Sequence, residues 1–464
     1  MAVRQTNRGE KKVSMAQANY FLDRRKNKSN TFLMPSKELL KTIITDSHAS
    51  VIPEVWERTQ QIPTSSGKII ALTGVRRSGK TYHLFGIMNK LKAEGLASEK
   101  FLYVNFEDER LHIKGEDMDL LLQAYRELYP DLDMSECYFF FDEIQEVDGW
   151  EQFIDRLYRS ISPHVFVTGS NSKLLSQEIA STLRGRAIAF EVYPLSFIEF
   201  VSVVNPGLNA HNSADRAKLV NLFESFLHNG GFPEIVKQDE SLREKILQEY
   251  FDVMLLRDLV ERYKISQVAV LRYFCKRVVG ASAGAFSVNK VYNDLTSQNY
   301  RVSKDTLYSF QSNVEAIYLS RFVPKYDESV VKTEGSQKKA YVIDQGFGAA
   351  LDFKLSQDTG RLLETTVALE LLKQGKSIAY YQDSAECDFV VIEKGQVTEA
   401  VQVSASMTNE QTRTRELKGL VQCCKRFGLE KGTVVTLDTD EQLESEGVQV
   451  TVVSGWKHFF GDKE

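Results

Sequence analysis

Residues 74–81 read GVRRSGKT and match the pattern G-x-x-x-x-G-K-[ST] at every fixed position. Residues 68–73 just before them are mostly apolar and predict a short buried strand, and residues 82–96 after them have helical spacing. A strand, a glycine-containing loop and a helix in this order are typical of a phosphate-binding loop, because glycine lets successive backbone N–H groups turn towards one anion. The chain is therefore expected to form an α/β fold with a nucleotide site at this loop.

The loop residues share the task of holding the nucleotide. We expect the cofactor-binding set to be Gly74, Arg76, Arg77, Ser78, Gly79, Lys80 and Thr81, together with Asp142. Lys80 would reach the β- and γ-phosphates of ATP as a point charge, and the Thr81 hydroxyl is a candidate ligand of Mg²⁺. In a typical loop of this kind, the side chains of Arg76 and Arg77 point away from the phosphates.

A second motif, YFFFDE at residues 138–143, is an apolar run that ends in two acids. Such a run predicts a central parallel strand buried on both faces, and ligands bind at the carboxyl ends of these strands. We expect Asp142 to hold Mg²⁺ and Glu143 to orient or deprotonate the attacking water. Two carboxylates at a strand end could also form a solvated turn, but their position downstream of the phosphate loop favours the catalytic interpretation.

A third strand is predicted at residues 164–171, which read HVFVTGSN. Asn171 or Ser170 could contact the γ-phosphate and the attacking water, with Thr168 behind them. Either residue could equally be an ordinary N-cap of the following helix. Both interpretations stay open.

The motifs in this order carry a family resemblance. Residues 74–81, 139–145, 165–175 and 183–200, followed by 341–347, 360–371 and 387–391, resemble bacterial and archaeal AAA-superfamily P-loop ATPases that carry a C-terminal domain of unknown function. The resemblance implies an ATPase that uses ATP and Mg²⁺, and it leaves the substrate and the pathway undefined.

In AAA ATPases a neighbouring subunit usually supplies an arginine to the γ-phosphate, so the resemblance also implies a homo-oligomer. Arg184 and Arg186 follow the third strand, and we favour Arg186 as this arginine. The alternative is a pair of surface arginines in ordinary salt bridges, which contribute little to stability.

Alternating strand and helix patterns predict a doubly wound parallel sheet with further domains behind it. The expected units are a basic N-terminal arm (1–30), an AAA-type P-loop ATPase domain (31–200), a helical lid (201–267), a winged helix (268–335) and a degenerate, restriction-endonuclease-like domain (336–464). Residues 31–61 look helical and lead into the ATPase sheet.

The predicted winged helix has short helices at residues 288–295 and 304–320, separated by a turn. A helix–turn–helix could place Lys304 and Tyr308 in a DNA groove, although Asp305 would lie unfavourably near phosphates. Winged helices are also common protein-binding modules. DNA and a protein are therefore both candidate partners.

In the last unit, Glu364 on a helix and Asp388 at the start of a strand have the order of a nuclease core. An active enzyme of this type would continue with an acid and a lysine on the next strand, where this chain has Gln402 and Ser404. Loss of two of the four groups removes most of the charge stabilisation, so nuclease activity is not expected.

Composition limits the remaining classes. Net charge is −5, and no apolar run has the ~18 residues that a membrane span needs. With no secretory signal pattern, we expect a cytoplasmic protein with no membrane partner and with its five cysteines reduced. Residues 1–28 carry eight Lys and Arg against two acids, so this arm could bind phosphate backbones or be a solvated tail.

Together these patterns predict an ATPase in which ATP hydrolysis drives or times a movement of the C-terminal domains, with DNA as a candidate substrate. One alternative is a slow, ATP-gated regulatory or defence switch that binds a protein. A second is a DNA-processing nuclease.

Overall fold

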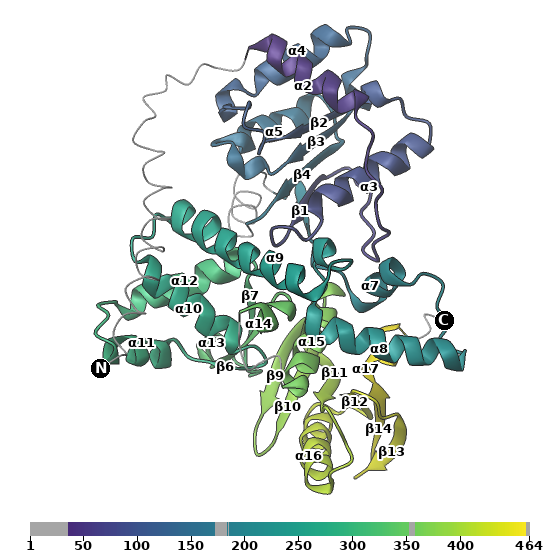
Figure 1. Ribbon diagram of the computed structural model, residues 1–464, viewed down its shortest axis with the longest axis vertical. Coiled ribbons are helices and arrows are strands. Elements are labelled where there is room, and N and C mark those ends of the chain that lie inside the picture. Colours follow the sequence, from purple (N-terminus) through teal and green to yellow (C-terminus); the bar gives the residue numbers. More distant parts are fainter. Residues whose placement is uncertain (1–35, 172–182, 184, 352–357, 461–464) are drawn as a thin grey trace, which may run out of the picture.

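The computed structural model describes residues 36–171, 183, 185–351 and 358–460. The predicted basic arm at residues 1–30 and Arg184 lie outside the described residues. A parallel α/β unit forms one end of the molecule, and the helices and sheets of the second half of the chain form the other (Figure 1).

The first unit contains a five-stranded sheet in the order β2-β3-β4-β1-β5, in which every pair is parallel. Its strands are β1 (Ile69–Thr73), β2 (Phe101–Asn105), β3 (Tyr138–Asp142), β4 (Val165–Gly169) and β5 (Ala187–Glu191). Its helices are α2 (Lys37–Ala49), α3 (Lys80–Ala93), α4 (Asp119–Leu128) and α5 (Trp150–Ser160), with short 3₁₀ turns η1 (Ser98–Lys100), η2 (Gly115–Asp117), η3 (Met134–Glu136) and η4 (Ile144–Glu146). The predicted parallel sheet of a P-loop ATPase is confirmed.

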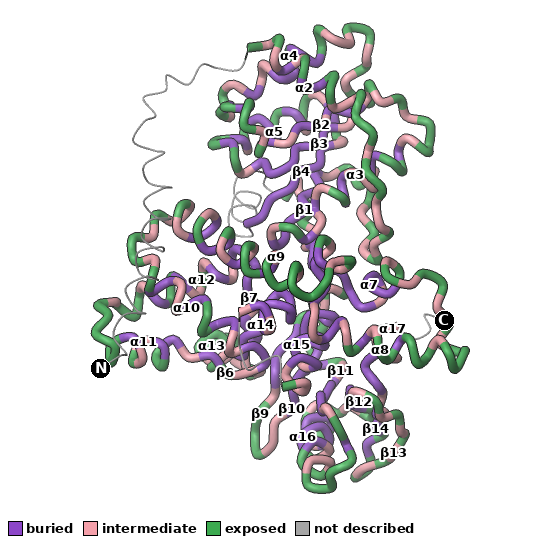
Figure 2. Tube along the Cα trace, in the orientation of Figure 1, coloured by how far each residue is buried: buried purple, intermediate pink, exposed green. Residues whose placement is uncertain are grey.

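Strand β3 shows why these apolar runs form central strands. Phe139 and Phe141 face one hydrophobic cluster, Phe140 faces another, and all three side chains are fully buried. A strand that is covered on both faces needs apolar residues at every position rather than alternation. Figure 2 shows the same burial along the neighbouring strands. Because the strands are parallel, their carboxyl ends meet at one edge of the sheet.

The expectation of a helix through residue 61 is wrong. Helix α2 ends at Ala49, and residues 50–62 have no regular secondary structure. Pro53 explains the end, because proline lacks an N–H and biases the residue before it towards extended conformations. The non-helical segment packs along α3, where Val55 lies 3.5 Å from the Cβ position of Gly86.

The middle of the chain is mostly helical. It contains α7 (Phe197–Val204), α8 (Ser213–Asn229), η5 (Pro233–Ile235), α9 (Glu240–Val253), the π-helix η6 (Met254–Glu261), α10 (Val268–Gly280), β6 (Gly284–Phe286), α11 (Val288–Ser297), α12 (Lys304–Ala316), β7 (Ser320–Val323), α13 (Val330–Gly335) and β8 (Lys338–Val342). The three strands form an antiparallel sheet in the order β6-β8-β7. The predicted boundary at residue 336 would assign β8 to the last unit, but β8 pairs with β6 and β7 in this sheet. Helix α12 ends at Ala316, before the expected residue 320.

The last unit is built on a mixed six-stranded sheet in the order β13-β14-β12-β11-β10-β9. Its elements are α14 (Gly346–Ala350), α15 (Thr359–Lys373), β9 (Ser377–Gln382), β10 (Glu386–Glu393), β11 (Gln396–Val403), α16 (Glu410–Phe427), β12 (Lys431–Thr436), β13 (Glu441–Ser445), β14 (Val448–Ser454) and α17 (Gly455–Phe460). One hydrophobic core joins α7 and α8 to this sheet, since Phe197 and Phe223 belong to the same cluster as Phe389 and Val401. Among the described residues, none of the helices is long and apolar enough to cross a membrane.

Candidate nucleotide-binding site

The phosphate loop connects β1 to α3 at the carboxyl edge of the parallel sheet. Two of its glycines are required by the backbone. Gly79 has a φ of 101°, and a Cβ on Gly74 would lie 2.2 Å from the Val192 carbonyl oxygen. Only glycine fits such positions without strain.

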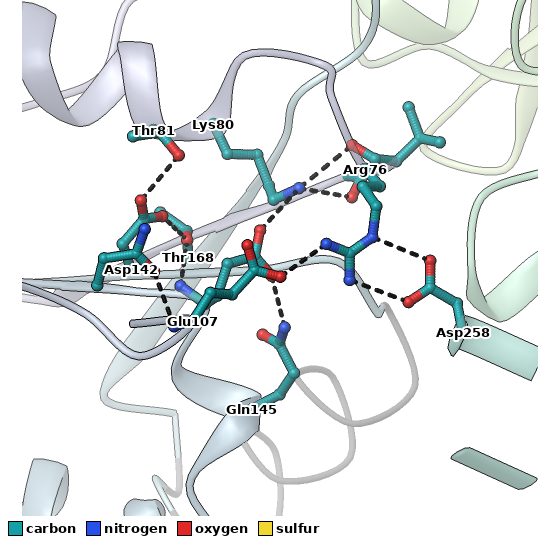
Figure 3. A network of polar contacts seen from close by, with 12 residues as sticks. Arg76, Lys80, Thr81, Glu107, Asp142, Gln145, Thr168 and Asp258 are labelled. Atoms are coloured by element: carbon teal, nitrogen blue, oxygen red, sulfur yellow. Dashed lines mark hydrogen bonds and ion pairs between the residues drawn. The ribbon is translucent and has the colours of Figure 1, made fainter. Parts of the chain in front are cut away.

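Lys80 is the first residue of α3, and its side chain is buried. Its Nζ donates to the carbonyl oxygens of Gly74 and Val75, each at 3.2 Å, and lies 3.5 Å from Glu143 Oε1 (Figure 3). The ammonium group therefore lies against the first residues of the loop, where it could contact a bound phosphate group.

Thr81 and Asp142 form the candidate magnesium pair. The Thr81 hydroxyl donates to Asp142 Oδ2 at 2.8 Å, and the Tyr103 hydroxyl donates to the same oxygen at 3.1 Å. The Thr168 hydroxyl donates to Oδ1. Burial, followed by the charge of Glu143, raises the pKa of Asp142, and the hydrogen bonds from Thr168 and Thr81 and the charge of Lys80 offset only part of this rise.

The hydroxyl oxygen of Thr81 and the carboxylate of Asp142 fit a hard cation. Magnesium is usually held by one or two protein oxygens together with substrate phosphates, rather than by a cage of protein ligands. The described part of the chain has no group of three or more His, Cys, Asp and Glu side chains that could hold a metal ion. Thr81 and Asp142 are the residues that would hold Mg²⁺ here.

Glu143 follows β3 in a left-handed backbone conformation, with φ 51° and ψ 47°. Non-glycine residues rarely adopt this conformation, and it often marks a functional position. The Glu143 N–H donates to the Thr168 hydroxyl at 2.9 Å, and Gln145 Nε2 donates to Glu143 Oε2 at 2.5 Å. Burial alone would raise the pKa of Glu143, but the Lys80 ammonium and the Gln145 hydrogen bond hold it below its ordinary value. The carboxylate is therefore ionised at neutral pH.

The third predicted strand, β4, brings its polar end to the same edge. Asn171 Nδ2 donates to the Tyr263 hydroxyl at 3.0 Å. The Ser170 hydroxyl is buried and has no hydrogen-bond partner among the described residues. Both candidates lie next to the Asp142–Glu143 turn, and their roles stay predictions.

The two loop arginines contact protein groups. The Arg76 guanidinium is an ion-pair partner of Glu107 at 2.7 Å and of Asp258 at 3.2 Å. Arg77 has a φ of 67°, and its exposed side chain lies 3.7 Å from Glu234. Both side chains point out of the loop, as a typical phosphate loop predicts.

Sequence reasoning missed Arg58, which lies in the segment that was expected to be helical. Its Nη1 donates to the Ser78 carbonyl at 3.2 Å, and its Nη2 donates to the Tyr193 carbonyl at 2.7 Å. Its Nε lies 3.0 Å from Glu199. Arg58 thus joins the phosphate loop to the residues after β5. No local pattern marks it, because all its contacts are distant in sequence.

Arg186 lies at the other end of the sheet. Its carbonyl oxygen accepts from the Ile69 N–H at 2.9 Å, and its guanidinium pairs with Asp155 at 2.6 Å. Because β1 runs from Ile69 to the phosphate loop, about 15 Å of strand separates this arginine from the loop of its own chain. Arg186 cannot reach that site, so any role at a phosphate would be on a neighbouring subunit.

A second polar cluster lies in the last unit. Lys339 Nζ on β8 is 3.0 Å from Glu364 Oε1, 3.0 Å from Asp388 Oδ1 and 2.7 Å from Glu386 Oε1. Burial and the charge of Glu364 raise the pKa of Asp388 to about 7. The sequence pattern predicts a lysine only on the strand after Asp388. Lys339 comes instead from β8 of the preceding sheet, so no local pattern indicates it.

The positions expected to carry an acid and a lysine are also engaged. Gln402 Oε1 accepts from the Asp388 N–H at 3.2 Å, and its Nε2 donates to Glu416 at 2.6 Å. The Ser404 hydroxyl donates to the Ser406 carbonyl at 3.0 Å. The side chains of Gln402 and Ser404 therefore both have hydrogen-bond partners within the protein.

The fold and the phosphate loop define an AAA-type P-loop ATPase domain. The comparison with protein families agrees: residues 66–201 match an AAA domain (AAA_14), residues 220–359 match a domain of unknown function (DUF8612), and residues 359–456 match another (DUF4143). The third match begins after β8, where the three-stranded sheet has ended.

Two curated proteins match nearly the whole chain. The chain is 33% identical to the uncharacterized protein MJ1544 of Methanocaldococcus jannaschii, over 92% of this chain and 96% of that protein. It is 31% identical to an uncharacterized protein of Haemophilus influenzae, over 84% of this chain and 94% of that protein. The chain therefore belongs to the same protein family as these two relatives.

Solved structures that match part of the chain include a Walker-type ATPase of Pyrococcus abyssi, at 16% identity, a TM-score of 0.39, and coverage of 68% of this chain and 96% of that one. The Holliday junction branch migration motor RuvB of Thermotoga maritima matches at 15% identity and a TM-score of 0.28, over 62% of this chain and 88% of that one.

Proposed function

We propose that this chain binds ATP with Mg²⁺ and hydrolyses it, with Glu143 as the base. The observation that carries this proposal is the meeting of four side chains from two loops at one sheet edge. Lys80 and Thr81 follow β1, and Asp142 and Glu143 end β3, within 3.5 Å of one another in the pairs described above. These are the groups that phosphoryl transfer to water requires.

The residues would divide the work as follows. The Gly74–Gly79 turn and Lys80 bind the phosphate groups, and Thr81 with Asp142 holds the metal ion. Magnesium, when bound, neutralises charge on the β- and γ-phosphate oxygens. The ionised carboxylate of Glu143 accepts a proton from the attacking water, and Gln145 keeps that carboxylate oriented.

Two variants test the proposal. Lys80→Ala should fail to bind ATP at concentrations that saturate the wild type, because the principal phosphate cation is lost. Glu143→Gln should bind Mg-ATP and turn it over about 10²-fold more slowly. Calorimetry measures ATP binding, and phosphate release measures turnover. Glu136→Gln is the matched control, because Glu136 is an exposed acid that precedes β3 at its amino end. Normal turnover by Glu143→Gln would refute its role as the base.

We propose further that hydrolysis drives or times a movement of the second half of the chain on DNA. Helices α10 to α12 with the sheet β6-β8-β7 support a winged helix in this part, and Lys304 and Tyr308 are exposed on α12. Duplex DNA binding, measured by fluorescence anisotropy, should weaken in Lys304→Ala/Tyr308→Ala and not in Lys276→Ala, an exposed lysine on α10. Binding that is absent in the wild type would favour the alternative, an ATP-gated switch that binds a protein.

The last unit is not expected to cut DNA, because Gln402 and Ser404 stand where an active nuclease needs an acid and a lysine. Incubation with supercoiled and single-stranded DNA in Mg²⁺ or Mn²⁺ tests this, with Asp388→Ala as the comparison. Cleavage that disappears in Asp388→Ala would show a working nuclease.

A further inference from the structure

One short segment of the second half of the chain contacts the nucleotide edge of the sheet. This segment, residues 254–263, consists of the π-helix η6 and the two residues after it, and we refer to it as the edge segment. Three of its residues, Arg257, Asp258 and Tyr263, contact groups that follow β1, β2, β3 and β4. The turn η5 also contacts the phosphate loop, where Glu234 lies 3.7 Å from Arg77.

The first contact is made by the phosphate loop itself. Arg76 Nε and Nη2 donate to the two carboxylate oxygens of Asp258 at 3.3 and 3.2 Å, and Asp258 is only 1% exposed. Burial alone would lower the pKa of Arg76, but Asp258 and Glu107 raise it above its ordinary value. A buried, two-pronged pair of this kind fixes the orientation of both partners.

The other contacts lie beside it. Arg257 is 3.2 Å from Glu107, which follows β2, and 3.4 Å from Glu146, which follows β3. The Tyr263 hydroxyl accepts from Asn171, which follows β4. All four strand-end loops that surround the candidate site therefore meet one segment.

The backbone of the edge segment is unusual. It continues α9 as a π-helix of eight residues, Met254–Glu261, and π-helical turns are rare and concentrate at functional sites. Leu255 and Leu259 of the same segment are buried in the core that also contains residues of α10, α12 and β8.

We propose that the edge segment transmits nucleotide occupancy to the α10–α12 unit, and that Asp258 is the positioning residue that ties it to the phosphate loop. This inference rests on the proposed binding of ATP. Phosphate groups would enter at Lys80 and at the backbone N–H groups of the loop, and they would add negative charge in a poorly solvated place, where it acts strongly on nearby ion pairs. Because Arg76 belongs to the same loop, its ion pairs with Glu107 and Asp258 would depend on whether nucleotide is bound, and so would the placement of the π-helix.

Hydrogen exchange followed by mass spectrometry tests this in a Glu143→Gln background, where ATP stays intact. Mg-ATP should slow the exchange of amides within residues 254–280 by about fivefold or more. The additional change Asp258→Asn should abolish the slowing while ATP still saturates the protein. Asp252→Asn, which removes a surface pair with Arg272 just before the edge segment, should preserve it.

The nucleotide-dependent difference separates transmission from a structural role, since a purely structural residue would alter exchange equally with and without ATP. If Asp258→Asn does not fold, Arg257→Gln serves instead, because Arg257 is 42% exposed and makes two of the contacts. It should reduce the slowing by about half or more. Failure of Glu143→Gln to bind ATP would contradict the proposed function. Bound ATP with unchanged or faster exchange in residues 254–280, or slowing that persists in the variants, would overturn this inference alone.

Discussion

At the scale of single residues, the candidate site depends on two positions where the local backbone geometry is critical. Gly74 must lack a Cβ because the Val192 carbonyl occupies that space. Glu143 must hold a left-handed turn so that its N–H reaches Thr168 and its carboxylate reaches Lys80. The phosphate-loop motif includes the glycine at residue 74, but neither sequence motif indicates the left-handed turn at Glu143.

Replacement of Gly74 tests the close approach. Gly74→Ala should cost about 3 kcal/mol of the free energy of unfolding and abolish ATP binding, since the new Cβ would meet a backbone oxygen that cannot move aside easily. Gly67→Ala is the control, because Gly67 also has a positive φ but has no atom within 4 Å of its Cβ position. Equal behaviour of the two variants in calorimetry and denaturant unfolding would argue against steric exclusion at residue 74.

His83 on α3 gives a prediction about pH. Burial, followed by the charge of Arg58, lowers the pKa of His83 to about 4, whereas an unfolded histidine titrates near 6.5. Between these values the unfolded chain binds a proton that the folded chain does not, so stability is lost as pH falls from 6.5 to 4. The loss from this group should approach about 3 kcal/mol, at about 1.4 kcal/mol per pKa unit.

The free energy of unfolding of the wild type and of His83→Gln, measured between pH 7 and 4, isolates this effect. The difference between the two proteins should shift in favour of the variant as pH falls through the window. A difference that stays constant would mean that His83 is protonated equally in both states.

At the scale of secondary structure, sequence patterns placed the parallel strands well and placed long-range contacts poorly. Strand β3 lies in the apolar run predicted at residues 138–143 and ends at Asp142, the first of the two acids that close that run. The error at residues 50–61 came from helical spacing that Pro53 overrides. The roles of Arg58, Asp258 and Lys339 could not be predicted, because each depends on partners that come close only in the folded chain.

Strand β8 belongs to the three-stranded sheet, yet it delivers Lys339 to acids of the last unit. Lys339→Met should cost about 3–5 kcal/mol of the free energy of unfolding, because removal of one partner leaves buried carboxylates uncompensated. Lys338→Met is the control, since Lys338 pairs with the exposed Glu334 at 3.6 Å. Adding Asp388→Asn to Lys339→Met should restore part of the loss. No restoration in denaturant unfolding would mean that the charge of Asp388 is not the cause.

At the scale of the whole molecule, the position of Arg186 gives a prediction about assembly. We expect Arg186→Ala to bind ATP but hydrolyse it slowly, and mixing it with Glu143→Gln should recover some turnover through mixed interfaces. Arg159→Ala is the matched control, since Arg159 pairs with the same Asp155 at 2.9 Å. Turnover that is independent of protein concentration, down to a monomer established by light scattering, would exclude an arginine supplied by a neighbour.

The shared core of α7, α8 and the last unit has a consequence for how these proteins evolve. Phe197 packs against Phe223, with ring centroids 5.0 Å apart, and against Phe460 near the end of the chain, at 6.4 Å. The AAA match ends at residue 201, inside α7. A gene fusion or exchange at that point would separate Phe197 of α7 from Phe223 and Phe460, the aromatic residues against which it packs. The ATPase part and the C-terminal part are therefore expected to be inherited as one piece, as the near-complete coverage of the two relatives already suggests.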